Sequence, residues 1–165
     1  MKKSISDDFL LDKFDVALLA ALQQDASATH QQLGEGVHLS PSQVSRRITR
    51  LQASGIIRRN VALLDPARLG LGVRAICYVT LARHGGEEGT AFEQEIAGFA
   101  EVLDCFAVTG ESDYILQIVA ASLHDLSESV LRRLARIKVV NSIRSNIVLQ
   151  TIKSSTVLPL SQLER

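Results

Sequence analysis

The chain has 165 residues, of which 46% are hydrophobic and 22% charged, and its 18 basic and 18 acidic side chains give no net charge. This composition excludes wholesale disorder and supports one medium domain or two small ones with an aliphatic core, because Trp is absent and only 4% of residues are aromatic. No apolar run approaches the ~20 residues of a membrane span, no secretory signal opens the chain, and two isolated cysteines in apolar runs predict buried thiols in a reducing cytoplasm.

The charges are segregated along the chain. Residues 36–64 contain five arginines and no acid, whereas residues 84–131 contain ten acids and neither Lys nor Arg. A basic segment suits a polyanionic partner, and an acidic segment repels one. The division therefore predicts two modules that meet different partners.

Apolar residues at helical spacing predict three short helices in the first module. Residues 12–24 form the first, and Ser27 or Thr29 caps a second that Gly36 closes. The third runs over residues 41–53.

The third helix has clear end signals. Ser40 is a good N-cap, Pro41 suits the first helical position, and Gly55 ends the helix. Its buried stripe consists of Val44, Ile48 and Leu51. Residues 56–65 then predict a β-ribbon or wing, which completes a winged module over residues 1–63.

Two helices joined by a turn of three or four residues form a helix-turn-helix, whose second helix enters the major groove of DNA. Hydroxyl and amide side chains reach base edges and phosphates there, and arginines neutralise phosphates or bond guanine. The candidate DNA-binding residues are Ser40, Ser42, Gln43, Ser45, Arg46, Arg47, Arg50, Arg58 and Arg59. The alternative is an ordinary solvated helix face. The cap, the turn length, the acid-free run and the wing together disfavour it.

A second module follows a hinge that is rich in turn residues, 64–72. Its predicted elements are a strand at 73–83, a helix at 89–100, a hairpin of strands at 102–110 and 113–121, a helix at 124–137 and a strand at 139–153. The order β-α-β-β-α-β predicts a ferredoxin-like domain over residues 73–160, and the fold class is α+β. Both helices cover one face of the sheet, and the apolar last strand predicts that a second copy covers the other, as a homodimer.

The two modules together resemble the Lrp/AsnC family, also called feast/famine regulators. The resemblance extends from Leu11 to Leu160. It is carried by "LDKFDVALLAALQQD", "LSPSQVSRRITRLQASGIIRRNVALLDPARLG", "CFAVTGESDYILQI" and "KSSTVLPL" in that order. It implies a transcription factor that binds double-stranded DNA, dimerises through its C-terminal domain, often assembles dimers into octamers, and commonly senses an amino acid between dimers.

In such relatives the loop between the two central strands lines the effector pocket. Here Gly110 permits a tight turn, neighbouring N–H groups suit a carboxylate, and Asp113 suits an ammonium group. The same composition also makes an ordinary hairpin turn. In some relatives, hydroxyl groups of the last strand also reach the ligand. The resemblance places Ser145 at one such position, whereas Ile143 stands where a threonine is usual, so Arg144 and the C-terminal tail are alternatives. The candidate effector residues are Thr109, Gly110, Glu111, Ser112, Asp113, Tyr114 and Ser145.

Two rival functions are weaker. Sirohaem decarboxylases resemble the family in both domains, but they would need basic residues and a histidine in the C-terminal cavity, and His84 and His124 read as surface residues. An assembly or amino-acid-binding protein with a vestigial helix-turn-helix would not keep its arginines. We expect no catalysis, no cofactor and no metal, because phosphate-binding loops and His/Cys clusters are missing.

Overall fold

The computed structural model describes residues 10–83 and 86–163, so His84 lies outside the described residues. The chain forms two compact units: residues up to Ala62 together with those from Lys153 onward, and residues from Leu63 to Ile152. The C-terminal tail thus belongs to the first unit, whereas the sequence predicted a C-terminal domain that runs to residue 160. Hydrogen bonds hold the tail there: the Gln23 amide donates to the Leu158 carbonyl (3.2 Å) and accepts from the Leu158 N–H (2.7 Å).

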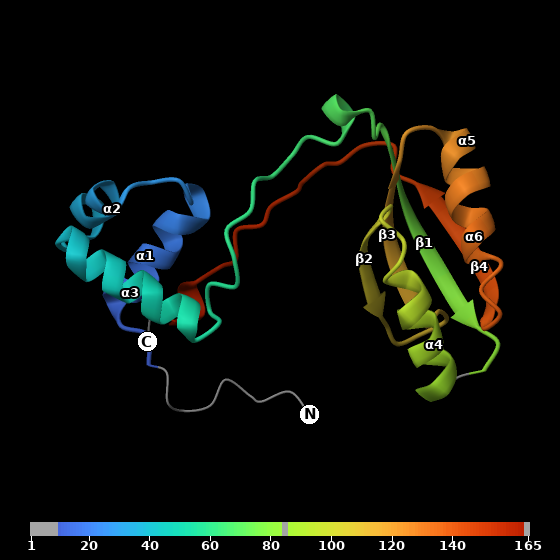
Figure 1. Ribbon diagram of the computed structural model, residues 1–165, viewed down its shortest axis with the longest axis horizontal. Helices are drawn as coiled ribbons and strands as arrows, with labels where there is room; N and C mark the ends of the chain where they lie inside the picture. Colours follow the sequence, from blue (N-terminus) through green and yellow to red (C-terminus); the bar gives the residue numbers. More distant parts are fainter. Residues whose placement is uncertain (1–9, 84–85, 164–165) are drawn as a thin grey trace. The chain divides into compact units, whose positions relative to one another are not determined.

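The first unit contains the three predicted helices, α1 (Lys13–Gln24), α2 (His30–Val37) and α3 (Pro41–Ala53) (Figure 1). Each begins with a capping box, in which the N-cap side chain and the third helical residue bond each other's backbone N–H groups. The caps are Asp12, Thr29 and Ser40. The apolar faces of the helices meet in a small core of Leu18, Leu33, Val37 and Val44.

Two local predictions in this unit are wrong. Gly36 does not close α2, which continues to Val37 and ends at His38 in the left-handed conformation (φ 57°). Residues 56–65 pair with no strand in the described chain and contain no regular secondary structure, so the predicted wing is not formed. An apolar segment of this kind makes a ribbon only when a second segment offers its own N–H and C=O groups as partners.

The second unit is a four-stranded antiparallel sheet with the strand order β2-β3-β1-β4. Its strands are β1 (Val73–Leu81), β2 (Val102–Ala107), β3 (Tyr114–Ala120) and β4 (Val140–Ile147). This order confirms the ferredoxin-like α+β fold. β4 ends at Ile147 rather than at residue 153.

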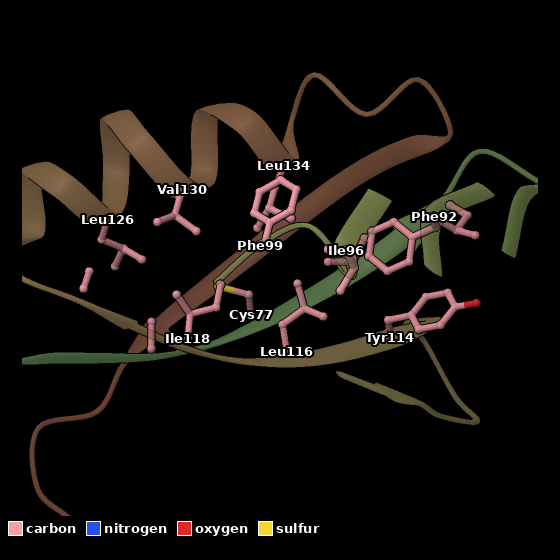
Figure 2. Packing of buried hydrophobic residues seen from close by; sticks show 14 residues of the cluster. Cys77, Phe92, Ile96, Phe99, Tyr114, Leu116, Ile118, Leu126, Val130 and Leu134 are labelled. Atoms are coloured by element: carbon pink, nitrogen blue, oxygen red, sulfur yellow. The ribbon is translucent and has the colours of Figure 1, made fainter. Parts of the chain in front are cut away.

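The helical layer covers one face of this sheet. It consists of α4 (Gly86–Ile96) and a second helix made of α5 (Leu123–Asp125), a π-helical segment (Leu126–Leu131) and α6 (Arg132–Leu134). Figure 2 shows Leu126, Val130 and Leu134 directed at the sheet, and all three are buried. Their spacing of four residues exceeds the 3.6 residues of an α-turn, and the wider π-helical turn keeps them in line.

The two cysteines differ in environment. Cys77 is buried and Cys105 is exposed, and both are free. The prediction of two buried thiols is therefore wrong for Cys105, because β2 is an edge strand whose residues are mostly solvent-exposed. Desolvation by burial raises the pKa of the Cys77 thiol.

Candidate nucleic-acid interface and effector pocket

The exposed face of α3 carries polar side chains that can meet DNA. Val44 and Leu51 are buried on the opposite side. Ser42, Arg46 and Thr49 are exposed and share the outward face, since helix positions three, four and seven apart align. The structure thus presents a hydroxyl-arginine surface on the second helix of a helix-turn-helix.

The first turn of α3 is held by its own cap. Ser40 Oγ accepts the Gln43 N–H (3.3 Å), and Gln43 Oε1 accepts the Ser40 N–H (2.9 Å). Ser42 Oγ lies 3.1 Å from Ser40 Oγ, and Ser45 is half-buried. Gln43 therefore uses its oxygen locally, and its amide N–H groups are not part of the cap.

Two of the predicted DNA-binding arginines are tied to α1. Arg47 Nη1 lies 2.8 Å from both Asp12 Oδ2 and Asp15 Oδ1. Arg50 Nη2 pairs with the other oxygen of Asp15, which is completely buried. The hydrogen bond to Asp15 raises the pKa of Arg47 despite the opposing effect of burial. Sequence reasoning missed Asp15, although an acid on the apolar side of a helical pattern, beside Val16, was a detectable signal.

The other three arginines of this set are exposed, and Arg50 is also 47% exposed although it pairs with Asp15. Arg46 lies on the outward face of α3, and no acid in the described part of the chain is seen to pair with it. Arg58 and Arg59 lie on the extended segment after α3. Of α3's arginines, Arg46 is exposed on the outward face, Arg50 is partly exposed beside it, and Arg47 is held by two carboxylates.

The loop between β2 and β3 lines an open pocket of about 670 Å³ on the sheet face that the helices leave bare. Gly110 has φ 120°, which only glycine adopts without strain, and it permits this loop to turn. Arg144 of β4 places its guanidinium 4.9 Å above the Tyr78 ring. The pocket residues that carry its chemistry are Tyr78, Thr109, Glu111, Ser112, Ile115 and Arg144.

Two predicted effector residues have other roles in the chain. Asp113 Oδ2 accepts the Leu81 N–H at 2.8 Å, beyond the end of the β1–β3 pairing. Tyr114 is buried on the helix-covered face, where its ring lies 4.6 Å from that of Phe92 and its hydroxyl donates to Glu93. Burial and this Glu93 contact raise the pKa of Tyr114 to about 12.

Ser145, a third predicted effector residue, also lies on the helix-covered face. Its hydroxyl is 3.3 Å from the Cys77 sulfur, whereas the neighbouring Arg144 lies on the open face. The structure therefore groups residues 109–112 with Arg144 and separates them from Tyr114 and Ser145 within one chain.

A second open cavity of about 800 Å³ lies beside α4 and α6. Its cationic residues are Arg133, Arg136 and Lys138, and none of the described histidines lines it. Arg133 pairs with Glu101 (3.0 Å) and stacks on the Phe99 ring. His124 is exposed at the start of α5.

Neither a membrane-spanning helix nor a metal-binding cluster is found in the described residues. None of the helices there is long and apolar enough to cross a bilayer. In the same part of the chain, no group of three His, Cys, Asp or Glu side chains is placed to hold a metal ion.

Comparison with known proteins matches two family models. Residues 11–52 match the AsnC-type helix-turn-helix domain, and residues 74–158 match the Lrp/AsnC ligand binding domain. The two matches together cover both units.

Individual relatives match over nearly their whole length. The glutamate uptake regulatory protein of Zymomonas mobilis is 33% identical over 152 residues, which are 92% of each chain. The DNA-binding transcriptional activator DecR of Escherichia coli (strain K12) is 33% identical over 151 residues, 92% of this chain and 99% of the relative. The solved structure of a Neisseria meningitidis transcriptional regulator in complex with L-Met has 38% identity and a TM-score of 0.88, covering 93% of this chain and 99% of the other.

Proposed function

Because the chain belongs to the Lrp/AsnC family of DNA-binding transcriptional regulators, we propose that it binds duplex DNA through α3 and that a small amino acid or related metabolite in the C-terminal unit controls this binding. The observation that carries the DNA-binding part is the acid-free outward face of α3, with Arg46 at its centre. A regulator of this kind acts where the DNA is, so we place it in the cytoplasm.

The three arginines of α3 are not equivalent candidates for contacts with DNA. Arg46, Ser42 and the amide of Gln43 face outward. Arg58 and Arg59 follow on exposed backbone and suit phosphate contacts. Replacing Arg47 or Arg50 would remove one cationic partner from the buried carboxylate of Asp15. A loss of DNA binding in those variants would therefore reflect a less stable fold as well as a lost DNA contact.

Arg46→Ala is expected to weaken binding to target DNA by about 1–3 kcal/mol if Arg46 reads a base, and by less if it contacts phosphate alone. The salt dependence of binding should become shallower, because a phosphate that Arg46 no longer neutralises keeps its counterion. Gel shifts on the protein's own promoter region at several salt concentrations measure both effects. Arg68→Ala removes the same charge from the second unit, where Arg68 pairs with Asp65, and should bind like the wild type. Unchanged affinity in Arg46→Ala would contradict the assignment of α3.

The effector proposal is supported by the charges around the pocket of the β2–β3 loop. An amino acid carries a carboxylate and an ammonium group close together. Arg144 and backbone N–H groups near Gly110 suit the carboxylate, and Glu111 suits the ammonium. Tyr78 and Ile115 offer apolar contact to the side chain.

Arg144→Met is expected to lower amino-acid affinity roughly tenfold to a hundredfold, because a charged hydrogen bond is worth about 1.5–3 kcal/mol. A thermal-stabilisation screen selects the amino acid, and calorimetric titration then gives both affinities. Arg132→Met is the control, since Arg132 pairs with Glu128 on the helical layer. Equal affinities would place the ligand elsewhere, and no binding by any amino acid would leave the loop as an ordinary hairpin turn.

We also propose that two copies pack their open sheet faces together, with dimers assembling further to octamers. The support for this proposal is apolar surface on the open face of the sheet. Ile115 and Phe106 share this face, and Phe106 is 54% exposed in the single chain.

A further inference from the structure

Asp15 is the one charged residue in the described part of the chain whose side chain is completely buried. A buried carboxylate is costly unless hydrogen bonds and opposite charges satisfy it. Both oxygens are satisfied here. Oδ1 accepts from Arg47 at 2.8 Å, and Oδ2 accepts from Arg50 and from the Asp12 N–H at 3.1 Å. The contacts join the start of α1 to the middle of α3.

These contacts determine how α3 is rotated about its axis. Arg47 and Arg50 are three positions apart, so they lie on the same side of the helix, and Asp15 holds that side against α1. Arg46 is one position from Arg47 and therefore points about 100° away from it. The Arg47 guanidinium is further packed 5.4 Å from the Phe14 ring centre.

The contacts also change the charge that α3 offers to DNA. Asp12 and Asp15 place two negative charges against Arg47 and Arg50, which lowers the positive potential on that side of α3. The remaining arginine of α3 is Arg46. Non-specific DNA binding grows with the number of phosphates neutralised, whereas base recognition depends on a few placed side chains.

We infer that Asp15 is a positioning residue for DNA specificity. Together with Asp12 it holds Arg47 against α1, and through its contacts with Arg47 and Arg50 it orients α3 so that Arg46 and Ser42 face the groove. This rests on the proposed function of α3. If Asp15 had a structural role alone, replacing it would change the stability of the fold but not the ratio of the affinities for target and non-target DNA.

Asp15→Asn keeps the shape of the side chain and removes its charge, and it is expected to make the protein bind DNA less selectively. Arg47 then keeps Asp12 as its charged partner and loses the buried carboxylate, so it should contact phosphates more readily and the affinity for an unrelated duplex should rise. The slope of log K against log salt should steepen by up to about one phosphate contact per helix-turn-helix, which is worth roughly 0.9. The ratio of target to unrelated affinity should fall at least about tenfold, because α3 loses its fixed orientation.

The test measures dissociation constants of the full chain for its promoter duplex and for an unrelated duplex of equal length, at several salt concentrations. Asp15→Glu keeps the charge and should move both the slope and the ratio back toward the wild type. Asp25→Asn is the matched control, because it removes the same charge at the other end of α1, where Asp25 bonds Ser27. That control should keep the wild-type slope and ratio.

Asp12→Asn keeps the test decisive if Asp15→Asn does not fold. Asparagine is as good an N-cap as aspartate, and the substitution removes one of the two carboxylates on Arg47, so a smaller change in the same direction is expected. A wild-type slope and ratio in the folded variants, or a parallel loss of both affinities, would overturn the inference. A wild-type protein that does not distinguish the two duplexes would instead contradict the proposed function.

Discussion

Gly34→Ala is expected to disrupt the helix-turn-helix, whereas Gly36→Ala, two residues away in the same helix, should stabilise it. A Cβ on Gly34 would lie 2.3 Å from the Leu39 carbonyl oxygen, a distance that Cβ atoms do not tolerate. The obstacle is backbone, and the Leu39 N–H also donates to the Gly34 carbonyl (2.9 Å), so the turn cannot move without breaking this bond. We expect a cost of about 3 kcal/mol, at the upper end for overpacking.

A Cβ on Gly36 would meet no other atom within 4 Å, and Ala there should stabilise α2 by roughly 0.5–1 kcal/mol. Hydrogen exchange of the α2 and α3 amides and calorimetric melting, measured for both variants, separate the two cases. The expected result is faster exchange and a lower melting temperature for Gly34→Ala alone. Wild-type exchange in Gly34→Ala would show that the turn can accommodate a methyl group and would contradict the prediction.

Ile115→Asp is expected to convert the assembled protein to monomers. Ile115 pairs with Tyr78 on one side and with Phe106 on the other, so the three form a row across the open face of the sheet. If a second copy covers this row, each subunit buries an unpaired carboxylate in the variant. The dimer dissociation constant should then rise by at least about a hundredfold, since burying an unpaired polar group costs several kcal/mol.

Light scattering at micromolar concentration measures this change, and circular dichroism checks that the fold persists. Leu123→Asp is the control. It places the same charge on an exposed leucine at the start of α5, in the helical layer, and should leave the dimer intact. A monomeric wild type at micromolar concentration would contradict the proposed assembly, and a dimeric Ile115→Asp would place its interface on another face.

Much of the fold was predictable because its signals are local. An N-cap residue directly precedes its helix, so the sequence predicted Ser40 as the cap of α3 and either Ser27 or Thr29 as the cap of α2, and the structure has Thr29. The spacing of Phe92 and Ile96 predicted α4, and the order of strands and helices predicted the ferredoxin-like sheet. One wrong prediction was also local. Glycine often ends a helix, so Gly36 was expected to end α2, but His38 adopts the left-handed conformation that ends this helix.

The functional sites were predictable as segments but not as side chains. The basic helix and the 109–114 loop were evident from charge and turn composition. Which arginines are available was decided by Asp15, which lies 32 positions from Arg47. Likewise, Asp113 is engaged by a backbone N–H 32 positions away. Composition and periodicity report neighbours within a few residues, whereas the partner of a charge is set by which elements the folded chain packs together. The sequence therefore determined that this protein has a basic helix in a helix-turn-helix and a turn-rich loop between two strands. The tertiary structure decided that Arg46 lies on the outward face of that helix and Arg144 lines the pocket of that loop, whereas Arg47 and Asp113 are engaged within the chain.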